Sequence, residues 1–280
     1  MVASLQGEQS MIRKLSTGAF GALFADIAAA DWAINMPKGV TELSAETYEI
    51  HMLIFWWCVA IAVVVFGAMI YSLIYHRKSK GVEPAKFSHS MTAEVIWTAI
   101  PVVILLIMAV PSAELMIKLE DTRDPDMTIV ATGYQWKWHY DYQGEGVAFY
   151  STLARPSVEA RRRGSGIDPK SVDNYLLEVD NRLVVPKDAK IRLLLTSNDV
   201  LHAWWVPELA IKKDAIPGYV NETWFRATQT GVFRGQCAEL CGMDHGYMPI
   251  VVEVIEPEAF DAWLENEKGG AATIAAVGGE

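Results

Sequence analysis

The sequence predicts a membrane-anchored all-β protein, in which a two-helix transmembrane hairpin is followed by a β-sandwich or barrel domain. Two observations predict this fold class: a pair of long segments without charged side chains, and a C-terminal half built from short β-rich runs. A third observation, a cluster of cysteine, histidine and methionine near the C-terminus, indicates what chemistry the β domain carries.

Two apolar segments meet the length requirement for crossing a bilayer. Residues 52–75 contain no charged side chain, and neither do residues 95–113. A spanning helix needs about 20 predominantly apolar residues. The alternative, a pair of buried helices in a soluble core, is disfavoured because such helices rarely run so long without charge. We therefore predict transmembrane helices at about residues 48–76 and 94–118.

The loop between these helices predicts their orientation. Residues 76–94 carry four basic side chains against two acidic ones, and loops rich in Lys and Arg stay on the cytoplasmic side of a membrane. The N-terminus and the large C-terminal part are then expected outside, on the periplasmic side of a bacterial inner membrane. Membrane lipid is accordingly an expected partner.

The domain boundaries follow from changes in composition. Residues 1–30 contain an Arg-Lys pair and a mildly apolar run that ends in alanines, which resembles a signal peptide, although an aspartate interrupts the run. The sequence does not decide whether this segment is cleaved. Residues 31–119 hold the hairpin, residues 120–268 are expected to form one soluble domain, and residues 269–280 a flexible tail.

The soluble part has a β pattern. Short runs rich in Val, Ile, Tyr and Trp, such as residues 127–142, are separated by Gly, Pro, Asn and Asp, which is typical of a sandwich or barrel. The polar insert at residues 154–174 contains three consecutive arginines and is expected to be a surface loop with a solvated basic run. Residues 257–268 predict a short helix with proline at its start.

The soluble part is also strongly acidic. Residues 120–280 carry 25 acidic and 16 basic side chains, so nearly all of the chain's net charge of −10 lies there. Such a surface is commonly just solvated, but it can also steer a basic partner toward a site. No nucleic-acid partner is expected.

The stretch "GQCAELCGMDHGYMP" at residues 235–249 concentrates metal-binding side chains. Cys237 and Cys241 are four residues apart, His245 follows after four more, and Met248 after three. A disulfide is permitted outside the cytoplasm but leaves the histidine and methionine unexplained. Zinc seldom takes a thioether, and c-type haem attachment needs C-x-x-C-H. Thiolate, imidazole and thioether together favour copper, and the second cysteine leaves room for a second metal.

A binuclear site needs another histidine, and His202 is the candidate. It lies among Trp and Val in "NDVLHAWWVP". Alone, such a histidine is more often a core or surface residue than a ligand. Blue-copper β-sandwiches, however, take one histidine from an earlier strand and the remaining ligands from the last loop. The presence of the ligand-rich residues 235–249 therefore favours His202 as a metal ligand.

These segments together resemble subunit II of the haem-copper cytochrome c oxidases, most of all the bacterial aa3-type. The resemblance covers about residues 45–268 and is carried by "NDVLHAWWVPELAIKKDAIPG", "GQCAELCGMDHGYMPIVVEV" and "GYQWKWHYDY" after two membrane helices. It implies a cupredoxin-like domain with a copper A centre that accepts electrons from cytochrome c. The electrons pass to haem in subunit I, where O₂ is reduced to water and protons are pumped. Subunit I and other oxidase subunits are the implied partners.

The resemblance also implies a ligand set. Two copper ions would be held by both cysteines, one histidine each, a weak methionine ligand and a backbone carbonyl. The implied copper ligands are Cys237, Cys241, His202, His245, Met248 and the carbonyl of Glu239. The Glu239 carboxylate would in addition help to bind Mg²⁺ or Mn²⁺ at the interface with subunit I.

Further residues take roles from the same resemblance. Trp136 would receive the electron from cytochrome c, and Glu94 would lie at the entrance of a proton-uptake path. The implied docking acids are Asp141, Asp180 and Asp199. Glu94 is equally explained as a helix N-terminal acid, and Trp136 as a packing residue.

Two positions depart from the family pattern. Tyr219 replaces a common arginine and Asp244 a frequent asparagine, and neither receives a role from the sequence.

The main alternative function is that of a metal-free, membrane-anchored docking subunit, similar to quinol oxidase subunit II, with a Cys237–Cys241 disulfide. A copper A domain like that of nitrous oxide reductase is a third hypothesis, but the catalytic domain of that family is absent from this sequence.

Overall fold

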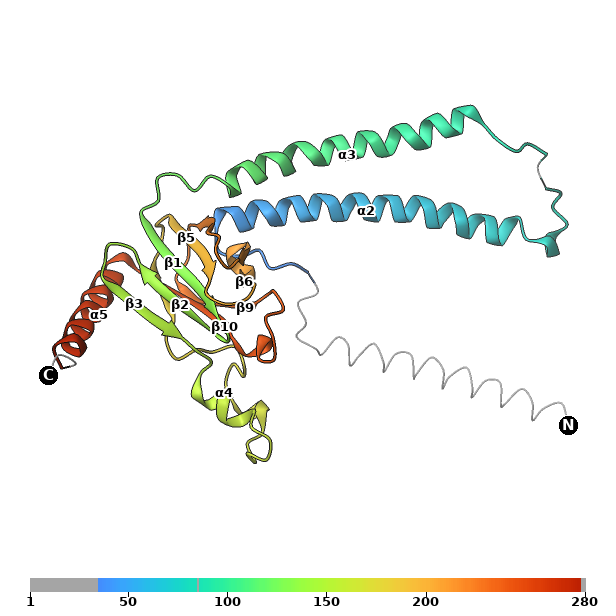
Figure 1. Ribbon diagram of the computed structural model, residues 1–280. Coiled ribbons are helices and arrows are strands. Elements are labelled where there is room, and N and C mark those ends of the chain that lie inside the picture. Colours follow the sequence, from blue (N-terminus) through green and yellow to red (C-terminus); the bar gives the residue numbers. More distant parts are fainter. Residues whose placement is uncertain (1–34, 85, 278–280) are drawn as a thin grey trace, which may run out of the picture. The chain divides into compact units, whose positions relative to one another are not determined.

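Two long helices precede a β-sandwich in the computed structural model, as Figure 1 shows. The structure describes residues 35–84 and 86–277, with side chains up to residue 269. The N-terminal elements are α2 (Glu42–Tyr75), the 3₁₀ turn η1 (Lys78–Lys80) and α3 (Met91–Leu119). This arrangement confirms the predicted fold class.

Helix α2 begins at Glu42, earlier than the start predicted near residue 48, because a capping box fixes its first turn. The Thr41 hydroxyl accepts a hydrogen bond from the Ser44 N–H at 2.9 Å, and the Ser44 hydroxyl accepts one from the Thr41 N–H at 2.9 Å. Glu42 adds negative charge at the positive end of the helix dipole. A hydropathy criterion does not detect these polar residues, so it places the helix start too late.

Both N-terminal helices expose their apolar side chains. They are long and apolar enough to cross a membrane, and only 0% and 6% of their apolar windows are buried by the described chain. Helix α3 continues through Pro101 and Pro111. Lys118 Nζ lies 2.7 Å from Glu46 Oε1 and joins the two helices. The exposed apolar faces are therefore available to lipid or to other subunits.

The β domain consists of two five-stranded sheets that share one core. The first sheet contains, in spatial order, β3 (Val147–Ser151), β2 (Lys137–Tyr142), β1 (Met127–Tyr134), β5 (Ile191–Ser197) and β8 (Asn221–Phe225). The second contains β4 (Leu183–Pro186), β10 (Pro249–Ile255), β9 (Gly231–Cys237), β6 (His202–Val206) and β7 (Ile211–Ala215). Strands β1 and β5 pair in parallel, as do β10 and β4, and the other pairs are antiparallel.

Inward-facing side chains of both sheets form the core. In β5, buried and half-buried residues alternate, as expected for a strand with one face in the core. Trp138, Tyr140 and Trp204 are fully buried, and Trp204 Nε1 donates to the Tyr140 hydroxyl at 3.3 Å. These large rings fix the separation of the sheets, and hence the place where the loops at one end of the sandwich meet.

Two surface elements differ from the sequence prediction. The insert at residues 154–174, expected to be a loop, contains helix α4 (Arg155–Ala160) and the turn η2 (Pro169–Ser171). Ser157 and Ala160 of α4 are 1% and 6% exposed. The insert is therefore anchored by buried small side chains, which a polar composition does not reveal.

The described C-terminal end of the chain is helical. The signal peptide predicted for residues 1–30 lies outside the described residues. Helix α5 spans Pro257–Val277, so it continues through most of the segment 269–280 that was predicted to be a flexible tail. The helical part of that segment contains four alanines, and alanine has the highest helix propensity. Phe260 and Leu264 of α5 are buried in the core, which anchors the start of the helix.

Candidate metal centre

The candidate metal ligands meet at one end of the sandwich. Cys237 ends β9, and β9 pairs with β6 so that Cys237 lies opposite Trp204, two residues from His202. This close pairing requires Gly235, because any Cβ there would collide with the Trp205 carbonyl. The remaining ligands lie in the loop between β9 and β10, which contains the 3₁₀ turn η4 (His245–Tyr247). Two strands and one loop therefore build the site.

Both cysteine sulfurs lie beside a histidine nitrogen. Cys237 Sγ is 3.8 Å from His202 Nδ1, and Cys241 Sγ is 3.5 Å from His245 Nδ1. The two sulfurs are 3.9 Å apart, almost twice the length of a disulfide bond, about 2.05 Å. Both cysteines are free and buried, and His202 is fully buried.

Each sulfur also lies near a weaker donor atom. Met248 Sδ is 3.5 Å from Cys241 Sγ. The Glu239 carbonyl oxygen is 3.4 Å from Cys237 Sγ. The site therefore has two similar halves, each with one thiol, one imidazole and one weak donor. This soft donor set fits copper, and the thioether fits zinc poorly.

The two thiols have opposite pKa shifts. Burial raises the pKa of Cys237, but hydrogen bonds from His202 and from two backbone N–H groups outweigh it and lower that pKa overall. Burial raises the pKa of Cys241, and the neighbouring Cys237 charge raises it further. Without a cation the site thus disfavours a second thiolate. Since thiolates are the form that binds metal, a cation is the natural stabiliser of the doubly ionised pair.

Asp199, predicted to be a docking acid, contacts the candidate ligand His202. Its Oδ1 lies 2.8 Å from His202 Nε2, and its Oδ2 accepts from the Gln135 N–H at 2.7 Å. Partial burial raises the Asp199 pKa, but the hydrogen bonds from His202 and from the backbone N–H groups of Val200 and Gln135 lower it overall. Such a carboxylate fixes the orientation of a metal-binding imidazole.

Gly133 provides the space for the His202 ring. A Cβ at this position would lie 2.7 Å from His202 Cδ2. Gly133 belongs to β1 of the first sheet, whereas His202 belongs to β6 of the second. The imidazole therefore fills a position at which the first sheet carries no side chain.

Trp136 contacts the ligand loop directly. Its indole Nε1 donates to the Cys241 carbonyl at 3.2 Å, and Gln135 Nε2 donates to the same carbonyl at 2.8 Å. Trp136 is half-buried, so its ring connects the protein surface with a candidate ligand. The sequence did not indicate Gln135, whose role depends on a contact across 106 residues.

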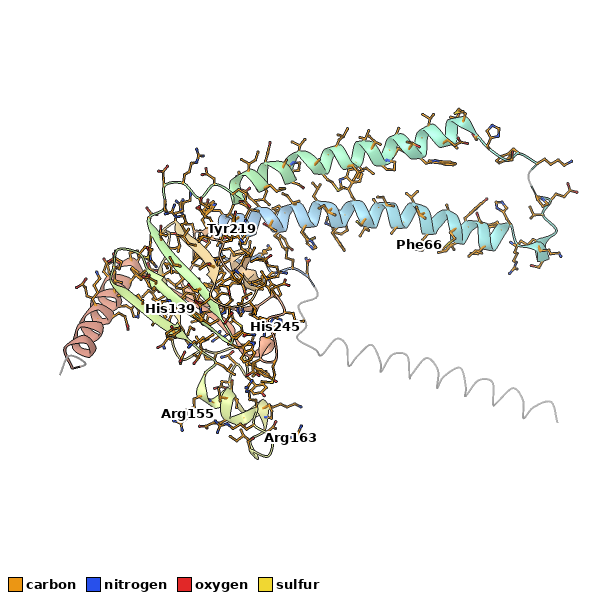
Figure 2. The ribbon with its side chains drawn as sticks, in the orientation of Figure 1. Phe66, His139, Arg155, Arg163, Tyr219 and His245 are labelled. Atoms are coloured by element: carbon orange, nitrogen blue, oxygen red, sulfur yellow. The ribbon has the colours of Figure 1, made fainter. Side chains whose placement is uncertain are left out.

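Asp244 pairs with an arginine from the insert. Arg161 Nη2 lies 2.9 Å from Asp244 Oδ2, and the Arg161 guanidinium carbon lies 4.0 Å from the centroid of the Tyr247 ring. This corrects the expectation that the basic run of the insert is entirely solvated. Figure 2 shows His245 on the side of the domain from which the insert projects, with Arg155 and Arg163 on the insert.

Asp180, Asp141 and Glu94 have no hydrogen bond or ion pair to a candidate ligand among the described residues. Asp180 accepts hydrogen bonds from the Thr152 N–H and hydroxyl at 2.7 and 2.8 Å, and Asp141 accepts one from Gln143 at 2.9 Å. Glu94 lies in the first turn of α3, at the opposite end of that helix from the β domain. The Glu239 carboxylate is half-exposed and has no hydrogen-bond or ion-pair partner among residues 35–84 and 86–269. It is therefore free to bind an external group.

Two protein-family models match the sequence. Residues 127–255 match the family model of the periplasmic domain of cytochrome c oxidase subunit II, and residues 29–115 match that of its transmembrane domain. A probable cytochrome c oxidase subunit 2 from Rickettsia bellii is 39% identical over 242 residues, 86% of each chain. The chain belongs to the cytochrome c oxidase subunit II family. It is therefore membrane-anchored, with a cupredoxin-like β domain.

Other members of the subunit II family are similarly close. Cytochrome c oxidase subunit 2 from Cereibacter sphaeroides is 35% identical over 286 residues, covering 94% of this chain and 93% of that protein. The crystal structure of the periplasmic domain of subunit II from Bradyrhizobium japonicum is 43% identical. That match covers 53% of this chain and 98% of the other, with a TM-score of 0.46.

Proposed function

We propose that this chain is the electron-accepting subunit of a cytochrome c oxidase and holds two copper ions as a copper A centre. The observation that carries the proposal is the pair of free, buried thiols 3.9 Å apart, Cys237 and Cys241, each beside a histidine nitrogen. The β domain would lie on the periplasmic side of a bacterial inner membrane, because the loop between the helices is basic.

The residues of the site would hold the metals with little freedom to move. Cys237 and Cys241 would bind both ions, and His202 and His245 one each. When bound, the two copper ions would supply a one-electron carrier whose change in charge is shared between both metals and both sulfurs. His202 is fixed by Asp199, and the Cys241 carbonyl by two hydrogen bonds. A fixed ligand shell keeps the reorganisation energy of electron transfer small.

Electrons would enter through Trp136. The half-buried indole donates its N–H to the Cys241 carbonyl, so one hydrogen bond connects the ring with the backbone of a metal ligand. A direct hydrogen bond therefore joins the Trp136 side chain to the ligand loop. A donor docked over Trp136 would thus be coupled to the centre.

The donor would be cytochrome c, which is basic. Asp141 and Asp180 would contribute to its docking surface, whereas Asp199 is engaged by His202 and Gln135 and would act mainly as a ligand support. Opposite charges accelerate encounter at low salt. The acidic β domain supports this choice of partner.

The remaining partners would lie toward the membrane. The exposed apolar faces of α2 and α3 would contact subunit I, other oxidase subunits and lipid. The free carboxylate of Glu239 would share a Mg²⁺ or Mn²⁺ ion with subunit I, and Glu94 would lie at the entrance of a proton path. Haem and O₂ chemistry, with proton pumping, would belong to subunit I.

Rapid mixing of the oxidised, copper-loaded chain with reduced cytochrome c tests this function. We expect second-order electron uptake whose rate constant falls as ionic strength rises, because salt screens the attraction between the partners over about 10 Å at 0.1 M. Absence of electron uptake would contradict the proposed function. A rate constant that does not change with salt would remove the docking role of the acidic surface.

A further inference from the structure

The polar insert contacts the ligand loop through one arginine. Arg161 forms two hydrogen bonds to Asp244, at 3.2 and 2.9 Å, and stacks over Tyr247. Asp244 directly precedes His245, and Tyr247 directly precedes Met248. One guanidinium group thus binds the residues that precede two candidate metal ligands.

This contact distinguishes Arg161 from its neighbours. The side chains of Arg161 and Asp244 are 27% and 23% exposed. Arg162 and Arg163 are exposed and have no ion-pair partner among the described residues. A half-buried, two-pronged arginine–carboxylate pair is geometrically specific, unlike a solvated surface pair. The chain therefore provides matched control positions beside Arg161.

The turn η4 is contacted by Arg161 from outside the ligand loop. Asp244 is the N-cap residue of η4, but its side chain makes no capping hydrogen bond within the turn. The carboxylate is bound by Arg161 instead. The end of the ligand loop is thus bound by Arg161, which directly follows α4 and lies 83 residues earlier in the sequence.

The insert is itself well anchored. The Ser157 side chain is 1% exposed, and its hydroxyl accepts a hydrogen bond from the Leu176 N–H at 3.0 Å. The Ala154 N–H donates to the Glu178 carbonyl at 2.9 Å, and the Arg161 N–H to the Ser157 carbonyl at 3.0 Å. Arg161 therefore projects from a fixed support and can transmit that rigidity to the loop.

We propose that Arg161 is a positioning residue of the metal centre: it holds Asp244 and Tyr247 and thereby fixes His245 and Met248 in place. This inference rests on the proposed copper site. It assigns a function to the insert, and to Asp244, which replaces the asparagine frequent in the family pattern. Loss of Arg161 would loosen the half of the site formed by Cys241, His245 and Met248 and would leave the Asp244 charge unpaired.

The test measures copper release rather than turnover. The full-length chain in detergent is loaded with copper and mixed with excess chelator, and the release rate is followed for the original protein, Arg161→Ala and Arg163→Ala. We expect about tenfold faster release from Arg161→Ala, at the lower end of effects for residues that support metal ligands. The histidine nitrogen couplings in the EPR spectrum should change as well. Arg163→Ala, which removes the same charge, should match the original protein.

Three further variants, Arg161→Lys, Asp244→Ala and the double variant Arg161→Ala with Asp244→Ala, separate positioning from general destabilisation. Arg161→Lys keeps the charge but loses the planar fork, so release should be faster than from Arg163→Ala while the far-UV circular dichroism is unchanged. Combining Arg161→Ala with Asp244→Ala should accelerate release by less than the product of the single effects, because the pair acts as a unit. Release from both Arg161 variants at the rate of Arg163→Ala would overturn the inference. Failure of the original protein to bind copper would instead overturn the proposed function.

Discussion

Asp199 Oδ1 lies 2.8 Å from His202 Nε2, while the other ring nitrogen of His202 faces the Cys237 sulfur at 3.8 Å. One imidazole thus connects a carboxylate to a buried thiol. The carboxylate sets both the ring orientation and the tautomer that a metal would meet.

Replacing Asp199 by Asn should weaken copper binding about 10- to 100-fold, the range found when a support of a metal-binding histidine is removed. Competitive titration with a copper chelator measures this change. Asp180→Asn is the matched control, because it removes the same charge from a carboxylate that binds only the region of Thr152 and Asn181. Equal copper affinities of the two variants would show that Asp199 acts only through surface charge.

Gly133→Ala should displace the His202 ring, because the new Cβ would lie 2.7 Å from Cδ2. Overpacking of this kind costs about 1–3 kcal/mol of folding stability, measurable by urea unfolding of the metal-free protein, and copper affinity should fall too. Gly246→Ala is the control in the ligand loop, since a Cβ there has no neighbour within 4 Å. A fully tolerated Gly133→Ala would contradict the described packing of His202.

Trp136→Phe should slow electron uptake from cytochrome c by about tenfold or more, equivalent to at least about 1.4 kcal/mol of barrier. The copper spectrum should stay intact, because Gln135 still binds the Cys241 carbonyl. Stopped-flow reduction and visible spectra measure the two effects separately. Unchanged uptake would refute the role of Trp136, and a lost spectrum would show that the indole is structural.

Glu239→Gln should separate the two proposed roles of this residue. The backbone carbonyl that lies 3.4 Å from Cys237 Sγ is retained, so copper content should be unchanged. The neutral side chain should lose affinity for a hard divalent cation, seen as a weaker Mn²⁺ EPR signal in the intact oxidase grown with manganese. An undiminished Mn²⁺ signal would remove the carboxylate from that site.

The cluster of candidate ligands could be predicted because most of its residues lie close together in sequence. Cys237, Cys241, His245 and Met248 fall within twelve residues, and the structure brings them together with His202. The helices were predictable for a similar reason, since an apolar run is a local property. The start of α2 was predicted too late, because the Thr41–Ser44 capping box carries no hydropathy signal.

The supporting contacts could not be predicted, because they join residues far apart in the chain. Arg161 and Asp244 are 83 residues apart, and Gln135 and Cys241 are 106 apart. Asp199 did carry a local signal: it precedes His202 by three residues, a spacing that placed the carboxylate next to the ring where the chain enters β6. The docking role predicted for Asp199 came from the family resemblance and not from this spacing.

Copper analysis of the purified full-length chain, combined with its EPR spectrum, tests the central claim most directly. We predict two copper ions per chain and a mixed-valence signal in which one unpaired electron is shared by both ions. Loss of that signal in Cys237→Ser and Cys241→Ser should follow. A chain that binds no copper and contains a Cys237–Cys241 disulfide would contradict the account, as would a single copper ion with a mononuclear spectrum.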